Sequence, residues 1–396
     1  MAIAAAPILL AASLASAGIV GALAVPSVFL AYRVGPTSAN VSISDAALLC
    51  AIPVAMLNLR SVERPLSSMI RLVSVYELVL LGVVATHPSS VAITEWAHRF
   101  VLMVGGLVVG AAIVRLGSVR FALRAFLVVA GVYALAAVIW TVTHGLAPAY
   151  PLNTHKNASG GLFAMAIALI ATMPLDDVVP HRAYRPLYLL YGAALLATRS
   201  RGAMIGAAIV LGAFVFSQRS AKRLRVIVAL SAVAGLVFVW TSVRDERRTD
   251  IGKTGSLSLR DDQQAQASDV FRAHRLTGAG IRYYDENPEL AKAGRPSSTA
   301  YEVTAESGVV GAADLLFLVS GVFVIFRRVR APYAATAMAV FGVKVVHAVF
   351  DIFWVAGPFT LPWLILGMAA VIEYTDEDDD VTDRQATSAD LTPAQR

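Results

Sequence analysis

The chain has 396 residues, of which 57% are hydrophobic and only 15% are charged. Soluble domains carry about 25% charged residues, so a water-soluble fold of this size would lack the polar surface to cover itself. The net charge of +6 comes from basic residues in short loops beside apolar segments, which membrane topology explains better than nucleic acid binding. The single cysteine, Cys50, excludes an internal disulfide and a metal site built from several thiolates.

Long apolar blocks follow one another along almost the whole chain. They predict an all-α polytopic membrane protein with about twelve transmembrane helices. The blocks lie near residues 5–32, 43–59, 69–86, 96–115, 121–143, 158–174, 185–198, 201–217, 224–242, 301–326, 332–350 and 354–373. Blocks 185–198 and 201–217 are short for spans and are expected to tilt or to meet in a tight turn.

Lysine and arginine placement predicts the orientation. The short connections near 60–64, 115–120, 182–185, 219–225 and 327–330 are rich in basic residues, whereas the alternate short connections hold Arg33, Arg99, Lys156, Arg199 and Arg201. Basic loops stay in the cytoplasm. The expected location is therefore the inner (plasma) membrane, crossed many times, with both termini cytoplasmic.

Two segments depart from the apolar pattern. Residues 243–299 form a long extracytoplasmic loop between the ninth and tenth expected spans, within a membrane domain covering 1–375. A connection this long is usually functional or disordered, and residues 268–275 within it suggest a short helix. Residues 376–396 are acidic and then rich in Ser, Thr, Ala and Gln, which predicts a disordered cytoplasmic tail.

The stretch from Thr198 to Gly202 is the sharpest local feature. Arg199 and Arg201 flank Ser200 at the junction of two spans. Arginine binds phosphate through a planar, bidentate fork, and Ser200 could cap the next helix, whose N-terminus favours an anion. This pattern points to a phosphate or diphosphate headgroup at the membrane surface, while a structural ion pair is the competing interpretation.

Other ionisable residues fall on the same predicted outer side. They are His155, Lys156, Arg99, Arg260, Arg282, His347 and Asp351. Charge at membrane depth is costly and usually marks a site, although any one of these side chains could simply extend to the interface. His347 and Asp351 stand four residues apart and so share one helix face. A carboxylate there can orient an imidazole for catalysis, or the pair can be a helix-packing contact.

Four stretches in this order resemble the O-antigen ligase and polysaccharide polymerase superfamily of bacterial membrane glycosyltransferases. They are His155-Lys156-Asn157, Thr198-Arg199-Ser200-Arg201-Gly202, Ser258-Leu259-Arg260 followed by Thr277-Gly278-Ala279-Gly280, and Pro296-Ser297-Ser298-Thr299-Ala300-Tyr301 leading into Glu306-Ser307-Gly308. The late His347 and Asp351 also look like the family. The likeness spans about residues 150–355, and the preceding spans match only in hydropathy.

The resemblance implies a cell-envelope enzyme of polysaccharide biosynthesis. Such enzymes transfer a glycan from a polyprenyl-diphosphate carrier to a glycan, lipid or protein acceptor on the extracytoplasmic face, without a cofactor or metal. The resemblance implies that Arg201 and Arg260 bind the diphosphate. Further candidates for substrate binding are Arg199, Arg282 and Lys156. The expected partners are the lipid-linked glycan donor, the acceptor and membrane lipids, with no nucleic acid.

The sequence departs from the family at its histidine. Ser297 stands where the family has the histidine that activates the acceptor hydroxyl, and Ser298 stands where asparagine is expected. Serine is not a base near neutral pH, so His347, Asp351, His155 or Glu306 would have to substitute in a catalytic protein. The alternatives are a non-catalytic subunit that binds lipid-linked glycan, or a membrane transporter.

Overall fold

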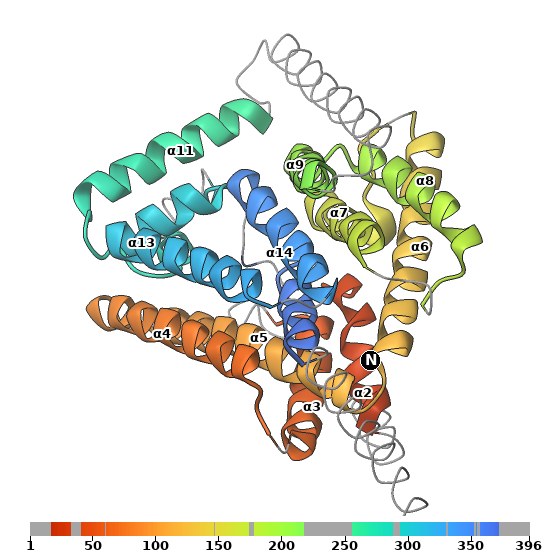
Figure 1. The fold of residues 1–396 in the computed structure, drawn as a ribbon. Helices are drawn as coiled ribbons and strands as arrows, with labels where there is room; N and C mark the ends of the chain where they lie inside the picture. Colours follow the sequence, from red (N-terminus) through yellow and green to blue (C-terminus); the bar gives the residue numbers. More distant parts are fainter. Residues whose placement is uncertain are drawn as a thin grey trace, which may run out of the picture.

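The computed structural model describes residues 17–32, 41–59, 61–145, 147–173, 178–217, 256–287, 294–329, 332–351, 354 and 357–371. The secondary-structure elements within these ranges are all helices (Figure 1). The expected all-α membrane fold is thereby confirmed for this part of the chain. The expected span at 224–242 and the acidic tail at 376–396 lie outside the described residues.

The helices follow one another along the chain with short connections. In order they are α2 (Ala17–Ala24), η1 (Pro26–Phe29), α3 (Ile43–Asn58), α4 (Arg64–Thr86), α5 (Ser90–Arg115), α6 (Val119–Thr143), η2 (Pro151–Asn153), α7 (Lys156–Thr172), α8 (His181–Thr198), α9 (Arg201–Ser217), α11 (Ser256–Ala273), α12 (Tyr283–Glu286), α13 (Thr299–Arg327) and α14 (Pro332–Phe350). A further apolar helix, Thr360–Val371, follows α14.

Five helices in the described part of the chain are long and apolar enough to cross a membrane, namely α4, α5, α6, α13 and residues Tyr333–Phe350 of α14. Five other apolar helices are shorter, including α3 and α7. At 1.5 Å per residue, a helix of 16 or 17 residues spans about 25 Å, less than the ~30 Å hydrocarbon core. The prediction of about twelve spans treated every apolar block as a full span. Some of these blocks form helices that are shorter than a full span.

Two expected segments took a different form. The block at 185–198 is part of α8, which begins with His181, Arg182 and Arg185 and is not among the apolar helices. The short helix expected at 268–275 is the end of α11, an 18-residue helix. In both cases the helix extends into polar sequence, which hydropathy alone does not reveal.

Helix α14 lies between two groups of helices (Figure 1). It packs against α7 and α9 on one side and against α13 on the other. Helix α13 in turn runs along α4, and α4 packs on α5. The end of α14 therefore touches segments that are far apart in the sequence.

Helix α13 is broken at Gly308, and a glycine-rich turn fills the break. Gly308 has φ of 64°, and a Cβ there would lie 2.3 Å from the carbonyl oxygen of Leu276. The N–H of Gly280 donates to the carbonyl of Glu306 at 3.0 Å, and the N–H of Val310 donates to the carbonyl of Leu276 at 3.1 Å. Two sequence motifs, residues 277–280 and 306–308, thus interlock through backbone hydrogen bonds.

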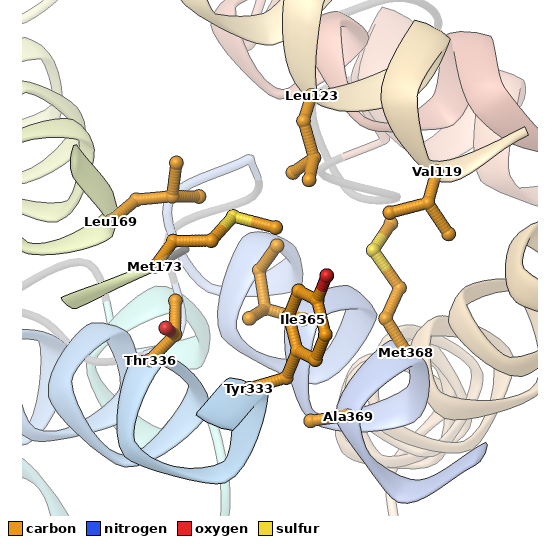
Figure 2. A pocket seen from close by; sticks show the side chains of 9 residues that line it. All are labelled: Val119, Leu123, Leu169, Met173, Tyr333, Thr336, Ile365, Met368 and Ala369. Carbon is orange, nitrogen blue, oxygen red and sulfur yellow. The ribbon is translucent and has the colours of Figure 1, made fainter. Parts of the chain in front are cut away.

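A small apolar cavity lies where α6 and α14 begin and α7 ends (Figure 2). Leu123, Leu169, Met368 and the ring of Tyr333 contribute to its wall. Its volume of about 10 Å³ would hold one water molecule at most. The cavity is packing space at the end of α14 opposite His347.

Candidate active site

His347, in the last turn of α14, lies where this helix packs against α7 and α9. Each neighbour approaches it with a glycine. A Cβ at Gly161 would lie 3.0 Å from Nδ1 of His347, and a Cβ at Gly202 would lie 3.1 Å from its Cδ2. Closely packed interiors have no room for an added methyl group at such distances. The two glycines therefore bring the motifs at 155–161 and 198–202 directly against this histidine.

The start of α13 is fastened to the end of α14. Thr299 donates to the backbone carbonyl of Asp351 from its N–H, at 3.2 Å, and from its hydroxyl, at 2.8 Å. The hydroxyl of Ser298 donates to the carbonyl of Val349 at 2.8 Å. The half-buried Ser297 directly precedes these contacts. The position at which the family resemblance expects histidine thus lies two residues before Thr299, which contacts Asp351.

His347 and Asp351 face each other on α14. Nε2 of His347 lies 3.5 Å from Oδ2 of Asp351. The imidazole is 2% exposed and the carboxylate 14% exposed. Neither ring nitrogen has a hydrogen-bond partner among the described residues. The carboxylate, rather than the imidazole, is accessible to a ligand, and the imidazole is placed to orient it from behind.

His155 caps the N-terminus of α7, and its side chain is partly exposed and partly covered by the protein. Its Nδ1 accepts a hydrogen bond from the N–H of Asn157 at 3.3 Å. The neutral ring therefore carries its proton on Nε2, which can donate it. Partial burial lowers the pKa of His155; Asp351 opposes this effect, whereas Lys156 and Arg260 reinforce it. Near neutral pH, His155 is a neutral hydrogen-bond donor.

Arg260 and Asp351 both act electrostatically on His155. These three side chains come from α11, the end of α14 and the cap of α7, so three separate segments share one neighbourhood. Lys156 is the first residue of α7. A helix N-terminus with nearby cations favours a bound anion.

A cavity of about 120 Å³ opens beside His155. Phe29, Tyr133 and Leu162 line its inner part, and Ser159 supplies a hydroxyl. Ser159 already exchanges a hydrogen bond of 2.7 Å with Thr154. The cavity is mainly apolar and lies on the α6 side of His155.

Arg199 and Arg201 flank the turn between α8 and α9. Arg199 ends α8 with φ of 50° and is exposed, whereas Arg201 begins α9 and is half-buried. The expected cap by Ser200 is not made by its side chain, because Oγ is buried without a hydrogen-bond partner among the described residues. A Cβ at Gly160 would lie 2.5 Å from the Cβ of Ser200, so this turn packs against α7.

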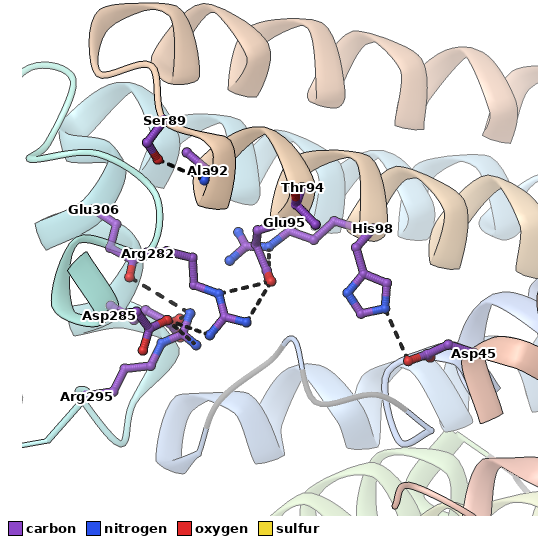
Figure 3. A network of polar contacts seen from close by, with 12 residues as sticks. Asp45, Ser89, Ala92, Thr94, Glu95, His98, Arg282, Asp285, Arg295 and Glu306 are labelled. Atoms are coloured by element: carbon purple, nitrogen blue, oxygen red, sulfur yellow. Dashed lines mark hydrogen bonds and ion pairs between the residues drawn. The ribbon is translucent and has the colours of Figure 1, made fainter. Parts of the chain in front are cut away.

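Arg282, expected from the sequence to contact substrate, lies in a buried charge network (Figure 3). Its Nε and Nη2 contact Oε2 of Glu95 at 3.0 and 2.9 Å. Its Nη1 contacts Oδ2 of Asp285 at 2.8 Å. All three guanidinium nitrogens are engaged within the protein, so Arg282 is placed to fix the loop on α5.

Sequence reasoning missed Arg295, which joins the same network (Figure 3). It forms an ion pair with Glu302 and lies 3.8 Å from Glu306 and 3.9 Å from Asp285. Burial alone would lower the pKa of Arg295, but these carboxylates raise it above its ordinary value. The sequence did hold a signal for this cation. Glu302 and Glu306 stand four residues apart near the start of an apolar span, and two buried carboxylates require a cation nearby.

Arg99 also belongs to the buried interior rather than to an exposed rim. Its Nε lies 3.0 Å from Oε1 of Glu95, and its guanidinium carbon lies 4.1 Å from the centre of the Trp354 ring. These contacts compensate the buried charge, while Nη2 of Arg99 is buried without a hydrogen-bond partner among the described residues. Arg99 therefore supports the helices beneath the surface site.

The described residues contain no group of three or more His, Cys, Asp or Glu side chains that could hold a metal ion. The chemistry available at the end of α14 is that of cations, a carboxylate and an imidazole.

Comparison with known proteins gives one family. Residues 186–314 match the O-antigen ligase family model. The matched range covers Arg199, Arg201, Arg260, Arg282 and Ser297, and His155, His347 and Asp351 lie outside it. No curated protein matches the chain. Residues 186–314 therefore form an O-antigen ligase family domain within a polytopic membrane protein.

Proposed function

We propose that the protein transfers a glycan from a polyprenyl-diphosphate carrier to an acceptor hydroxyl at the extracytoplasmic face of the membrane. Family membership implies lipid-linked glycan substrates and a role in surface polysaccharide assembly. The observation that carries the proposal is the convergence at the end of α14. This end is contacted by the α8–α9 turn through Gly202 and by the start of α13 through Thr299. The cap of α7, His155, is close enough for Asp351 to act on it electrostatically.

The diphosphate binds at the N-terminus of α7. Nε2–H of His155, the ammonium of Lys156 and the guanidinium of Arg260 are hydrogen-bond donors near this terminus, and the helix dipole adds partial positive charge. Arg201 completes the site from the start of α9. As the glycosidic C–O bond breaks, the leaving diphosphate takes the bonding electrons, and prearranged donors stabilise the charge that develops.

Asp351 acts as the general base. It is the accessible carboxylate of the site, and Ser297, which stands near it, cannot accept a proton at neutral pH. The acceptor hydroxyl gives its proton to the Asp351 carboxylate while its oxygen attacks the anomeric carbon. General-base catalysis contributes ~10²–10⁴-fold. His347 orients the carboxylate and does not touch the substrate, because it is buried between α7 and α9.

The orientation follows from the basic connections. The site lies at the end of the bundle where α8 and α14 finish and α7 and α13 begin. The connections at 60–64, 115–120, 182–185 and 327–330, rich in basic residues, belong to the opposite helix ends. By the positive-inside rule the site faces the extracytoplasmic side.

A second candidate function is binding of lipid-linked glycan without transfer, which Ser297 favours because the family's expected base is missing there. One assay distinguishes the two functions. Purified protein in liposomes is given the host's own lipid-linked glycan and a range of glycan, lipid and protein acceptors. Transfer supports the enzyme, whereas donor binding without product for any acceptor supports the binding subunit.

The same assay tests the diphosphate site. Arg260→Ala should abolish transfer and weaken donor binding, and Arg260→Lys should restore little, because an ammonium lacks the bidentate fork. Arg275→Ala is the matched control, since Arg275 is an exposed arginine just after α11. Wild-type turnover in Arg260→Ala would remove Arg260 from the site.

A further inference from the structure

The cavity of about 120 Å³ beside His155 runs inward along α7. Ala158 and Leu162 line it four residues apart, so they lie on one face of this helix. Phe29 of η1 and Tyr133 of α6 line its inner part together with Leu162, and each of these three side chains is at most 4% exposed. The cavity therefore leads from His155 toward the buried core.

The hydroxyl groups that line the cavity are already paired within the protein. Ser159 exchanges a hydrogen bond of 2.7 Å with Thr154. The hydroxyl of Tyr133 is hydrogen-bonded to that of Tyr32, which in turn donates to the backbone carbonyl of Leu152. A sugar ring inside the cavity would leave its own hydroxyls without partners, and unpaired buried polar groups are costly. The interior therefore fits an apolar group.

The rim of the cavity has the opposite character. His155 lines it at the N-terminus of α7 and can donate its Nε2–H, because Nδ1 accepts a hydrogen bond from Asn157. The helix dipole adds partial positive charge at this terminus. An anionic group at the rim and an apolar group inside the cavity are the two parts of one amphiphilic ligand.

The distance between the two parts selects the kind of lipid. Ala158, where the apolar wall begins, lies three residues after His155, or about 4.5 Å along the helix. In a phospholipid, glycerol and its ester groups separate the phosphate from the acyl chains. In an isoprenyl diphosphate, a single ester oxygen joins the phosphate to the first isoprene unit. The short spacing therefore fits the isoprenyl compound.

The size of the cavity limits how much of the chain can enter. One water molecule needs ~10–15 Å³, and the cavity of about 120 Å³ has roughly ten times that volume. A branched isoprene unit fits this space, whereas a long polyprenyl chain does not. The rings of Phe29 and Tyr133, with centroids 4.9 Å apart, border the cavity with aromatic surface for the double bond and methyl group of that unit.

We propose that this cavity binds the first isoprene unit of the lipid carrier. The protein then recognises its carrier at the unit next to the diphosphate and not by the length of the chain. The identity of the ligand rests on the proposed function, whereas the cavity and its paired hydroxyl groups do not.

The test compares two soluble ligands with the same head group: dimethylallyl diphosphate, which carries one isoprene unit, and methyl diphosphate. Their binding to the full-length protein in detergent is measured by isothermal titration calorimetry. Wild type should bind dimethylallyl diphosphate at least ~10-fold more tightly, because it buries several more carbon atoms.

Two variants change the cavity in opposite directions. Ala158→Leu fills part of it, and Leu162→Ala removes part of its wall. Both should reduce the preference for dimethylallyl diphosphate several-fold, and their binding of methyl diphosphate shows that they are folded. Ala193→Leu is the matched control for added size, because Ala193 is exposed on α8 outside the cavity.

The outcomes separate this inference from the proposed activity. A preference that both variants reduce supports the inference even if the protein never transfers a glycan. Equal affinity of wild type for the two ligands would overturn the inference and leave the diphosphate site in place, and so would an undiminished preference in both variants. Binding of neither ligand would overturn the diphosphate site and the inference together. Tighter binding of glucose 1-phosphate than of dimethylallyl phosphate, lost in Ala158→Leu, would overturn it in favour of a sugar.

Discussion

The backbone carbonyl of Asp351 accepts two hydrogen bonds from Thr299, one from the N–H at 3.2 Å and one from the hydroxyl at 2.8 Å. This contact joins the end of α14 to the start of α13, which lie 52 residues apart. It fixes Asp351 against Thr299, two residues after Ser297. Asp351, which the sequence offered both as a partner of His347 and as a substitute base, is the more accessible residue of the pair.

The close approach of α9 to α14 depends on Gly202. A Cβ there would lie 2.8 Å from the Cβ of Phe350 and 3.1 Å from Cδ2 of His347. Gly202→Ala should therefore displace α14, lower stability by about 1–3 kcal/mol, and reduce turnover. Gly192→Ala is the control, because a Cβ at Gly192 in α8 meets nothing within 4 Å. Thermal unfolding in detergent should separate the two, and equal midpoints would show that α9 tolerates the methyl group.

The buried network should respond strongly to loss of Arg295. Arg295→Ala leaves Glu302, which is fully buried, and Glu306, which is 2% exposed, without their cation. Removing one partner of a buried pair typically costs about 3–5 kcal/mol. Arg272→Ala, which breaks an exposed ion pair with Asp269, should leave the unfolding midpoint unchanged. Unfolding of both variants at pH 7 checks this, and a stable Arg295→Ala protein would contradict the network.

Stability should fall with acidification partly through His155. Its pKa is lowered by burial, so the folded state resists protonation relative to the unfolded chain. Its contribution is fully present above the ordinary pKa of about 6.5 and is lost as the pH falls below that value. His155→Asn keeps a capping oxygen for α7 and removes this titration. Denaturant unfolding between pH ~7.5 and ~5 should therefore show a shallower loss for the variant, and parallel curves would contradict the lowered pKa.

Orientation can be measured with single cysteines. In a Cys50→Ala background, Asp261→Cys lies on α11 and Val62→Cys in the exposed connection before α4. A membrane-impermeant maleimide added to intact cells should label Asp261→Cys and should reach Val62→Cys only after permeabilisation. The reverse pattern would put the site on the cytoplasmic side.

Helical class and motif order were readable from the sequence because apolar blocks and motif spacing are local properties. Span length was less readable. Hydropathy counts apolar residues but carries no information on where a helix ends. It therefore predicts full spans for α3 and α7, although these helices have 16 and 17 residues. Similarly, hydropathy marked only residues 185–198 as an apolar block. The helix α8 begins earlier, in polar sequence, and as a whole it is not among the apolar helices.

The pairing of charges could not be predicted, because it depends on contacts between distant segments. Arg282 and Glu95 are 187 residues apart, and only the fold shows that each guanidinium nitrogen of Arg282 is already engaged. An exposed arginine and a buried one look alike in a loop sequence. His347 posed the same difficulty, since the sequence does not show that it is buried between Gly161 and Gly202.

The most direct test of the proposed mechanism is single-turnover transfer by Asp351→Asn with saturating lipid-linked donor. The amide keeps the size of the carboxylate but cannot accept the acceptor's proton, so transfer should slow by at least ~10²-fold while donor binding stays at the wild-type level. Asp261→Asn should transfer at the wild-type rate, as an exposed aspartate outside the site. Transfer by Asp351→Asn at the wild-type rate would contradict the assignment of Asp351 as the general base.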